Sequence, residues 1–201
     1  MPLIIKVPGA AGAASRGGRA RGIVELVDLY RTYADIFGLG AVEPGVEGTS
    51  FAPLLLRSPS LPHSEYAFSQ YPRCALDNPA EDWTGQDCMT FPRTAIGHMG
   101  FSVRSESMRY TECARAPPLS AGSAAPYGVR CVAGRVWINS TLRADWSAAG
   151  LAGRELYSHA LDPVLNISDF DSSENANLAG SPAYAAAAQA LAAVLRRQFD
   201  V

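Results

Sequence analysis

The feature that most constrains the fold is a succession of short β-compatible runs separated by loops rich in proline and glycine. Four such runs span residues 66–71, 100–104, 110–113 and 135–138. Alternation of apolar and polar side chains in the first two runs predicts strands with one face on a core. Runs of this length with such loops between them favour a small antiparallel sheet.

The C-terminal segment predicts one helix that packs on this sheet. Ser181 and Pro182 suit an N-cap and a first helical position, and Arg196 and Arg197 close the segment with the charge that a helix C-terminus favours. The apolar residues that share one helical face are Tyr184, Ala188, Leu191 and Leu195. This stripe must be buried, and the sheet is the partner available in its half of the chain, so the predicted fold class is α+β.

The first forty residues predict a separate layer. Residues 3–7 are a short apolar run that predicts a buried strand, and residues 23–37 have the apolar spacing of an amphipathic helix, which Gly38 ends. Its apolar positions are Ile23, Val27, Tyr30, Ala34 and Phe37, and the carboxylates of Glu25 and Asp28 suit the dipole of its first turns. Glycine and proline become frequent over 38–62, so we place a domain boundary near residue 40, between 1–40 and 41–201.

Charge and hydropathy exclude two classes of partner. The 201 residues carry a net charge of −2, too little positive field to collect nucleic acid or an anionic membrane surface. The longest nearly apolar stretch, 183–195, falls short of the roughly 20 residues that a bilayer requires. The start of the chain lacks the basic region of a secretory signal peptide. We therefore expect neither nucleic acid nor membrane as a partner.

Four cysteines are spaced too widely for a zinc knuckle. They are Cys74, Cys88, Cys113 and Cys131. An even number allows two disulfides, and sequons at Asn139 and Asn166 agree with an oxidising compartment. A segment at 114–134, rich in alanine, proline and glycine, predicts a surface insertion whose base a Cys113–Cys131 pair would pin.

The usual sequence motifs of catalytic and cofactor sites are absent. No serine elbow or phosphate-binding glycine loop occurs, and His63, His98 and His159 lack metal-ligand spacing, which favours structural roles. Asp169 and Asp171 lie close together without the calcium-loop pattern, so we interpret them as solvated loop acids. From composition and spacing alone the chain is an α+β module without a visible active site.

Several strings, in order, resemble the C-terminal part of a sulfatase of the iduronate-2-sulfatase type, in the alkaline phosphatase-like superfamily. They are residues 2–9, the helix from Val24 through Leu39, 48–55, 67–73, 99–104, 109–112, 153–159, 162–163 and 177–179. The resemblance implies that residues 1–40 are the last strand and helix of a large α/β domain. It implies that 41–201 are the small C-terminal subdomain, with a four-stranded antiparallel sheet and a packed helix. Independently of the family, residues 155–157 are typical of a further strand in which Leu156 is buried.

The resemblance also implies a reaction whose machinery lies outside this chain. Such enzymes hydrolyse sulfate esters with a formylglycine made from the cysteine of a Cys-x-Pro-Ser-Arg motif, aided by calcium. None of the four cysteines here stands in that motif. We therefore expect no catalytic residue, metal site or cofactor in this chain, and a protein that is inactive alone and associates with the missing large domain.

Two residues remain as candidates for contact with the substrate, a sulfated carbohydrate. The loop entering the Met99–Arg104 run approaches the pocket in such enzymes, and where iduronate-directed members carry a basic residue this chain offers His98; Arg104 is the second candidate. Arg31, at a position where the family motif often has proline, and the 114–134 insertion are departures that weaken the inference to a specific substrate. The resemblance implies a lysosomal or secreted protein.

A different class of function stays open beside this one. The chain can be interpreted as a freestanding glycan-binding or subunit-pairing module. The difficulty for this alternative is that a strand and helix taken from a larger sheet expose an unpaired edge and an apolar face.

Overall fold

The computed structural model describes residues 3–9, 12–20, 22–43, 45–73, 97–115, 130–132, 135–137, 144–160 and 174–199. These residues belong to two compact units. The first comprises Met1–Ala67 with Cys131–Arg135, and the second Phe68–Arg130 with Val136–Val201. The division therefore falls near residue 67 in this chain. The assignment of 1–40 and 41–201 to two domains of a longer protein stays a prediction.

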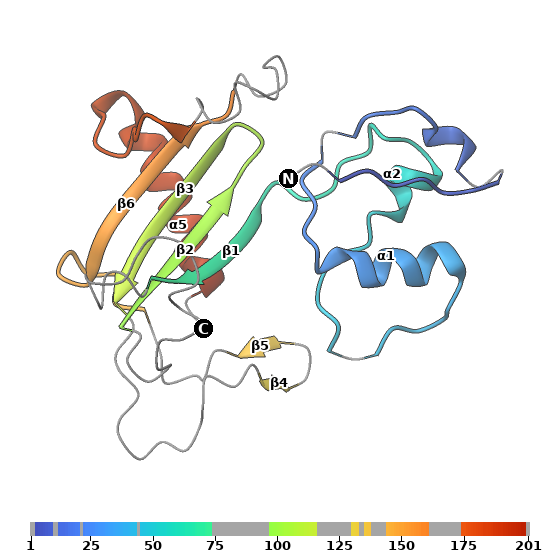
Figure 1. Cartoon of the computed structure of the whole chain (residues 1–201), viewed down its shortest axis with the longest axis horizontal. Coiled ribbons are helices and arrows are strands. Elements are labelled where there is room, and N and C mark those ends of the chain that lie inside the picture. The colour runs from blue at the N-terminus through green and yellow to red at the C-terminus, as the bar shows by residue number, and fades with distance from the viewer. Residues whose placement is uncertain are drawn as a thin grey trace. The chain divides into compact units, whose positions relative to one another are not determined.

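The first unit is built from short helices (Figure 1). They are η1 (Ala13–Ser15), α1 (Asp28–Phe37) and α2 (Ala52–Leu56). The end of α1 is as predicted, because Gly38 adopts the left-handed conformation with φ 61° and ψ 38°. Its start is five residues later than predicted, because the backbone of Ile23 pairs with Ser64 in an isolated bridge and leaves 24–27 to form turns.

The strand predicted over residues 3–7 is wrong for this chain. The segment has no strand, and the side chain of Ile4 is 92% exposed. A strand needs a neighbour to satisfy its backbone amides and carbonyls, and the described residues supply none here.

The predicted apolar face of α1 is only partly buried. Ala34 packs in a small core with Phe51, Ala52 and Leu54. The residues of α1 and its flanks that remain exposed form a stripe along the helix: Leu26, Val27, Tyr30, Tyr33, Phe37 and Leu39. The exposed apolar face expected from the sequence is therefore present.

The second unit contains the predicted sheet. Its strands are β1 (Ala67–Pro72), β2 (His98–Arg104), β3 (Met108–Arg115) and β6 (Leu151–Ser158), in the order β1-β2-β3-β6. The β2/β3 and β3/β6 pairs are antiparallel. The run at 135–138 was expected in the same sheet but instead gives β5 (Arg135–Trp137), which pairs only with β4 (Arg130–Val132). Most of the predicted 114–134 insertion lies outside the described residues, while its first two residues extend β3.

Helix α5 (Ala185–Phe199) follows η4 (Pro182–Tyr184) and runs across one face of the sheet (Figure 1). Leu191 and Leu195 are buried as predicted, and Phe199 closes against Phe68 and Phe101. Ser181 occupies the N-cap position in an extended conformation, but its side chain makes no capping hydrogen bond. Among the described residues, no helix has the length and apolar character that a bilayer span requires.

Successive side chains along each strand point to opposite faces of the sheet. Phe101, Val103, Tyr110 and Leu156 are buried on the α5 side, with Val103 and Leu156 fully buried. Alternate residues project to the other side, which we call the helix-free face. Its members on β2, β3 and β6 are His98, Gly100, Ser102, Arg104, Arg109, Thr111, Cys113, Arg115, Gly153, Glu155 and Tyr157.

Candidate functional site

The two predicted substrate residues lie on the helix-free face but at opposite ends of β2. His98 is its first residue and Arg104 its last. Six residues of strand at about 3.3 Å each separate them by roughly 20 Å. Both are half-buried. The structure therefore does not bring them together, and each has to be considered with its own neighbours.

At the His98 end, Arg73 extends across the sheet. Its backbone amide donates to the carbonyl oxygen of His98 at 3.0 Å, which joins the end of β1 to the start of β2. Its side chain then passes over Gly100, where an added Cβ would lie 2.8 Å from Arg73 Nε. The guanidinium lies near the Cys113 thiol, and its charge lowers the pKa of the thiol against the larger effect of burial. Sequence reasoning did not single out Arg73, although the glycine in the middle of a strand marked a close approach.

Cys113 is a free thiol in the middle of β3. The predicted pairing of Cys113 with Cys131 is therefore wrong for this structure. The physical reason is its position, because it faces Gly100 and Gly153 across the ladder and is covered by Arg73. Burial is the main cause that raises the pKa of the Cys113 thiol, so the sulfur stays protonated and poorly nucleophilic.

At the Arg104 end, an ion-pair cluster surrounds the hairpin between β2 and β3. Arg109, the cross-strand partner of Arg104, donates from Nη2 to Glu174 at 2.7 Å and lies over the ring of Tyr157. The other carboxylate oxygen of Glu174 lies 2.9 Å from Nε2 of the buried His159. Burial, followed by the charge of Glu155, raises the pKa of Tyr157. The sequence prediction of a structural role for His159 fits this contact.

A second polar cluster lies on the α5 side and ties the helix to the sheet. The carboxylate of Glu112 is fully buried and accepts two hydrogen bonds from Arg196, at 2.9 and 2.7 Å, and one from the Tyr110 hydroxyl at 2.7 Å. Burial and then this hydrogen bond raise the pKa of Tyr110 well above its usual range. Sequence reasoning interpreted Arg196 only as a charge at a helix end. The partners lie 84 positions apart, and the only local signal was an acid inside an alternating strand.

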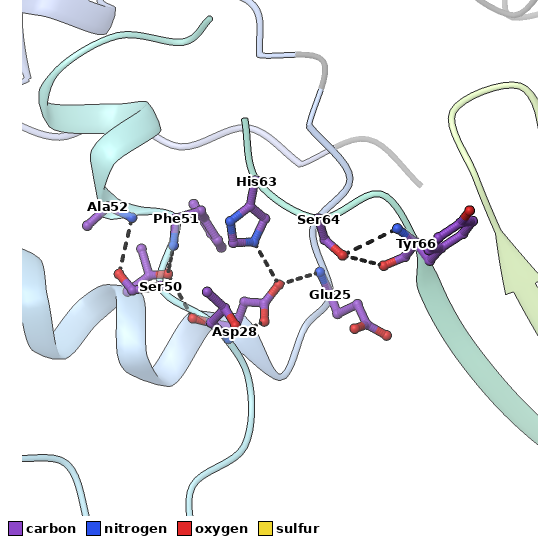
Figure 2. Close-up of polar contacts among 10 residues, drawn as sticks. Glu25, Asp28, Ser50, Phe51, Ala52, His63, Ser64 and Tyr66 are labelled. Atoms are coloured by element: carbon purple, nitrogen blue, oxygen red, sulfur yellow. Dashed lines mark hydrogen bonds and ion pairs between the residues drawn. The ribbon is translucent and has the colours of Figure 1, made fainter. Parts of the chain in front are cut away.

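In the first unit, Asp28 is the centre of a buried polar cluster (Figure 2). Its carboxylate accepts hydrogen bonds from the backbone amides of Glu25 at 2.9 Å and Thr49 at 2.8 Å, and lies 3.3 Å from Nε2 of His63. The side chains of Asp28 and His63 are both about 5% exposed. Asp28 therefore links three segments, a larger role than the dipole interaction predicted from sequence.

Arg31, the departure from the family motif, has a structural partner in the same unit. It donates from Nε and Nη2 to the carbonyl oxygen of Val46, at 3.2 and 2.7 Å. It therefore holds the loop after α1, a contact that proline could not make.

The described residues contain no group of three or more His, Cys, Asp or Glu side chains that would hold a metal ion. They therefore do not fit the calcium site that the resemblance implies for the complete enzyme. Cys74, Cys88, Asp169 and Asp171 lie outside the described residues.

Comparison with known proteins finds similarity to solved structures alone, and at low identity. No family model matches the sequence. No curated protein matches it either. Among solved structures, the phosphonate monoester hydrolase SpPMH from Silicibacter pomeroyi is similar, with a TM-score of 0.45 and 18% identity over 87% of this chain. A protein designated a candidate sulfatase from Bacteroides thetaiotaomicron is similar over 86%, with a TM-score of 0.44 and 18% identity. The chain spans about a quarter of each, 24% of their length.

Proposed function

We propose that this chain is the C-terminal portion of a sulfatase-family hydrolase, with the chemistry supplied by a large domain outside it. The observation that carries the proposal is that four of the nine resembling strings coincide with the strands of one sheet. The strings at 67–73, 99–104, 109–112 and 153–159 fall on β1, β2, β3 and β6, which are the four strands of one sheet.

The finer proposal is an enzyme of the iduronate-2-sulfatase type that acts on a sulfated carbohydrate. It rests on the residues that make up those strings and on His98, which stands in the segment where such enzymes bind the sugar carboxylate. Of the two candidate substrate residues we favour His98, because it stands in that segment, whereas Arg104 lies about 20 Å from it at the other end of β2. A lysosomal or secreted location belongs to the same proposal.

The catalytic proposal predicts that this chain alone does not hydrolyse sulfate esters. The test is an assay of the purified chain with 4-nitrophenyl sulfate and calcium. The expected result is a rate equal to that of buffer, since the described residues hold no metal-ligand group. Clear turnover that persists through rigorous purification would contradict the proposal.

A second test asks where the missing machinery is encoded. The DNA upstream of this coding region should contain an open frame with the Cys-x-Pro-Ser-Arg motif and metal-binding aspartates. Alternatively, a neighbouring gene would encode a large domain that restores activity when both proteins are expressed together. Absence of both would leave the subunit-pairing or glycan-binding alternative, for which the exposed apolar stripe of α1 remains a difficulty unless a partner covers it.

A further inference from the structure

The path of Arg73 across the helix-free face is unusual for an arginine next to a strand end. The residue follows β1 directly, and its side chain turns inward over β2 instead of outward into water. Its Nε lies 2.8 Å, and its Cγ 3.5 Å, from the place of a Cβ on Gly100. Only glycine at position 100 leaves room for this path, because any other residue would project into the guanidinium.

The two glycines that flank Cys113 in the ladder show that this space is specific to Arg73. Gly100 and Gly153 both face Cys113, from β2 and β6 respectively. A Cβ on Gly100 would meet Arg73, whereas a Cβ on Gly153 would meet nothing within 4 Å. The sheet therefore carries one crowded and one open glycine in equivalent positions.

The guanidinium of Arg73 retains an unused donor. Nε is buried and forms no hydrogen bond. The interaction found for the group is with the Cys113 thiol, a weak acceptor, and no carboxylate in the described part of the chain forms an ion pair with it. Arg73 as a whole is half-buried, but a buried N–H without a hydrogen bond is unfavourable unless an acceptor reaches it.

The geometry of arginine indicates which acceptor fits. Nε–H and one Nη–H point the same way along one edge of the guanidinium and match two oxygens of a carboxylate or a sulfate. His98 starts the neighbouring strand on the same face and is joined to Arg73 through the backbone. A ring nitrogen and a guanidinium edge therefore lie at the same end of the sheet.

We propose that Arg73, with His98 beside it, forms an oxyanion-binding site on the helix-free face, which takes a sulfate ester or a carboxylate. The site itself rests on the position of Arg73 over Gly100. Its interpretation as a contact to a sulfated or acidic sugar rests on the proposed function.

The test follows the Arg73 Nε–H signal by NMR in the full 201-residue chain. The signal is assigned by its loss in Arg73→Gln. The probes are methyl sulfate and acetate in separate titrations, at an ionic strength held constant with chloride, so that the two oxyanion sources are distinguished. The expected result is a saturable shift of this signal with at least one probe. In variants that lack this signal, binding is followed by the backbone amide of Gly100, over which Arg73 lies. Because the interaction is a charge-assisted hydrogen-bond pair, Arg73→Gln should weaken binding about tenfold or more.

Two matched glycine variants separate the site from general surface charge. Gly100→Ala should displace Arg73 and weaken binding, whereas Gly153→Ala should leave it unchanged. Circular dichroism checks that each variant folds, and Arg73→Lys, which keeps the charge but loses the fork, gives a second test if Gly100→Ala does not fold. The proposal is wrong if neither probe shifts the Arg73 signal, or if Arg73→Gln and Arg73→Lys both bind as the parent does.

The outcome is independent of the catalytic proposal. If a probe binds Arg73 but no large domain restores activity on co-expression, the oxyanion site stands and the sulfatase interpretation fails. Restored sulfatase activity without binding to Arg73 would do the reverse.

Discussion

On the two faces of the four-stranded sheet, the charged groups of Glu112 and Arg73 differ in how fully their hydrogen bonds are satisfied. On the α5 side the carboxylate of Glu112 is fully buried and every bond to it comes from this chain, through Arg196 and Tyr110. On the helix-free face Arg73 lies over the strands with a buried donor unused. The difference teaches that one alternating sequence can satisfy a buried charge fully on one face and leave a buried donor unused on the other, although Arg109 on that second face does pair with Glu174.

The largest expected effect is the loss of the ion pair on the α5 side of the sheet. Arg196→Met leaves the buried Glu112 without its ion-pair partner, so the free energy of unfolding should fall by about 3 kcal/mol. The control is Arg197→Met, one residue along α5 and exposed, which should change it by no more than about 0.5 kcal/mol. Urea denaturation of both variants measures the difference. Equal effects would show that Glu112 and Arg196 do not hold helix and sheet together.

The next effect concerns Gly100, the glycine on the helix-free face that Arg73 covers. Gly100→Ala should lower the free energy of unfolding by about 1–3 kcal/mol, because the methyl group and Arg73 compete for one space. Gly153→Ala should be neutral or raise it by up to about 1 kcal/mol, because a strand interior favours alanine over glycine. Thermal unfolding of the pair provides the measurement. A loss of stability in both variants would indicate that the position of Arg73 is not the cause.

A smaller effect is expected on the helix-free face, at the end of β2 where Arg104 lies. Glu174→Gln removes the charge that joins Arg109 to His159. Because Glu174 and Arg109 are each about one-third exposed, the loss should be about 1 kcal/mol or less. The exposed neighbour Asn175 serves as the control position, as Asn175→Ala. A loss comparable to that of Arg196→Met would make the two faces energetically alike.

The smallest effect is a dependence on pH. Burial raises the pKa of the Cys113 thiol, so the folded protein keeps a proton that the unfolded chain releases near pH 9. The unfolded state then binds fewer protons than the folded state, and the free energy of unfolding should fall as pH rises above about 8.5. Urea midpoints at pH 7.5 and 9.5 for the parent and Cys113→Ala measure this contribution. The fall should be smaller in the variant, and identical falls would mean that Cys113 does not cause it.

Local sequence signals predicted the elements of the second unit well. Strand alternation placed β1 and β2, a β-compatible run placed β3, the burial of Leu156 was expected, and the spacing of Leu191 and Leu195 identified the buried face of α5. These features depend on neighbours within a few residues, so the residue pattern contains them. The end of α1 at Gly38 was predictable for the same reason.

Features that depend on distant partners were not predictable. The run at residues 3–7 has the composition of a strand but no neighbour to pair with in the described part of the chain. The contacts from Asp28 to His63 and from Glu112 to Arg196 span 35 and 84 positions, and the path of Arg73 depends on a glycine in another strand. The candidate site was therefore predicted at His98 without Arg73, its neighbour in space.

The polar cluster around Asp28 has a consequence for how the first unit moves. Three backbone amides, those of Glu25, Thr49 and Phe51, donate to side chains of α1, the first two to Asp28 and the third to Thr32. None of them can exchange its hydrogen with water while those side chains stay in place. These three amides, from the turn before α1 and the loop before α2, should therefore open as one group, with a common protection against exchange, although helical hydrogen bonding accounts for none of them.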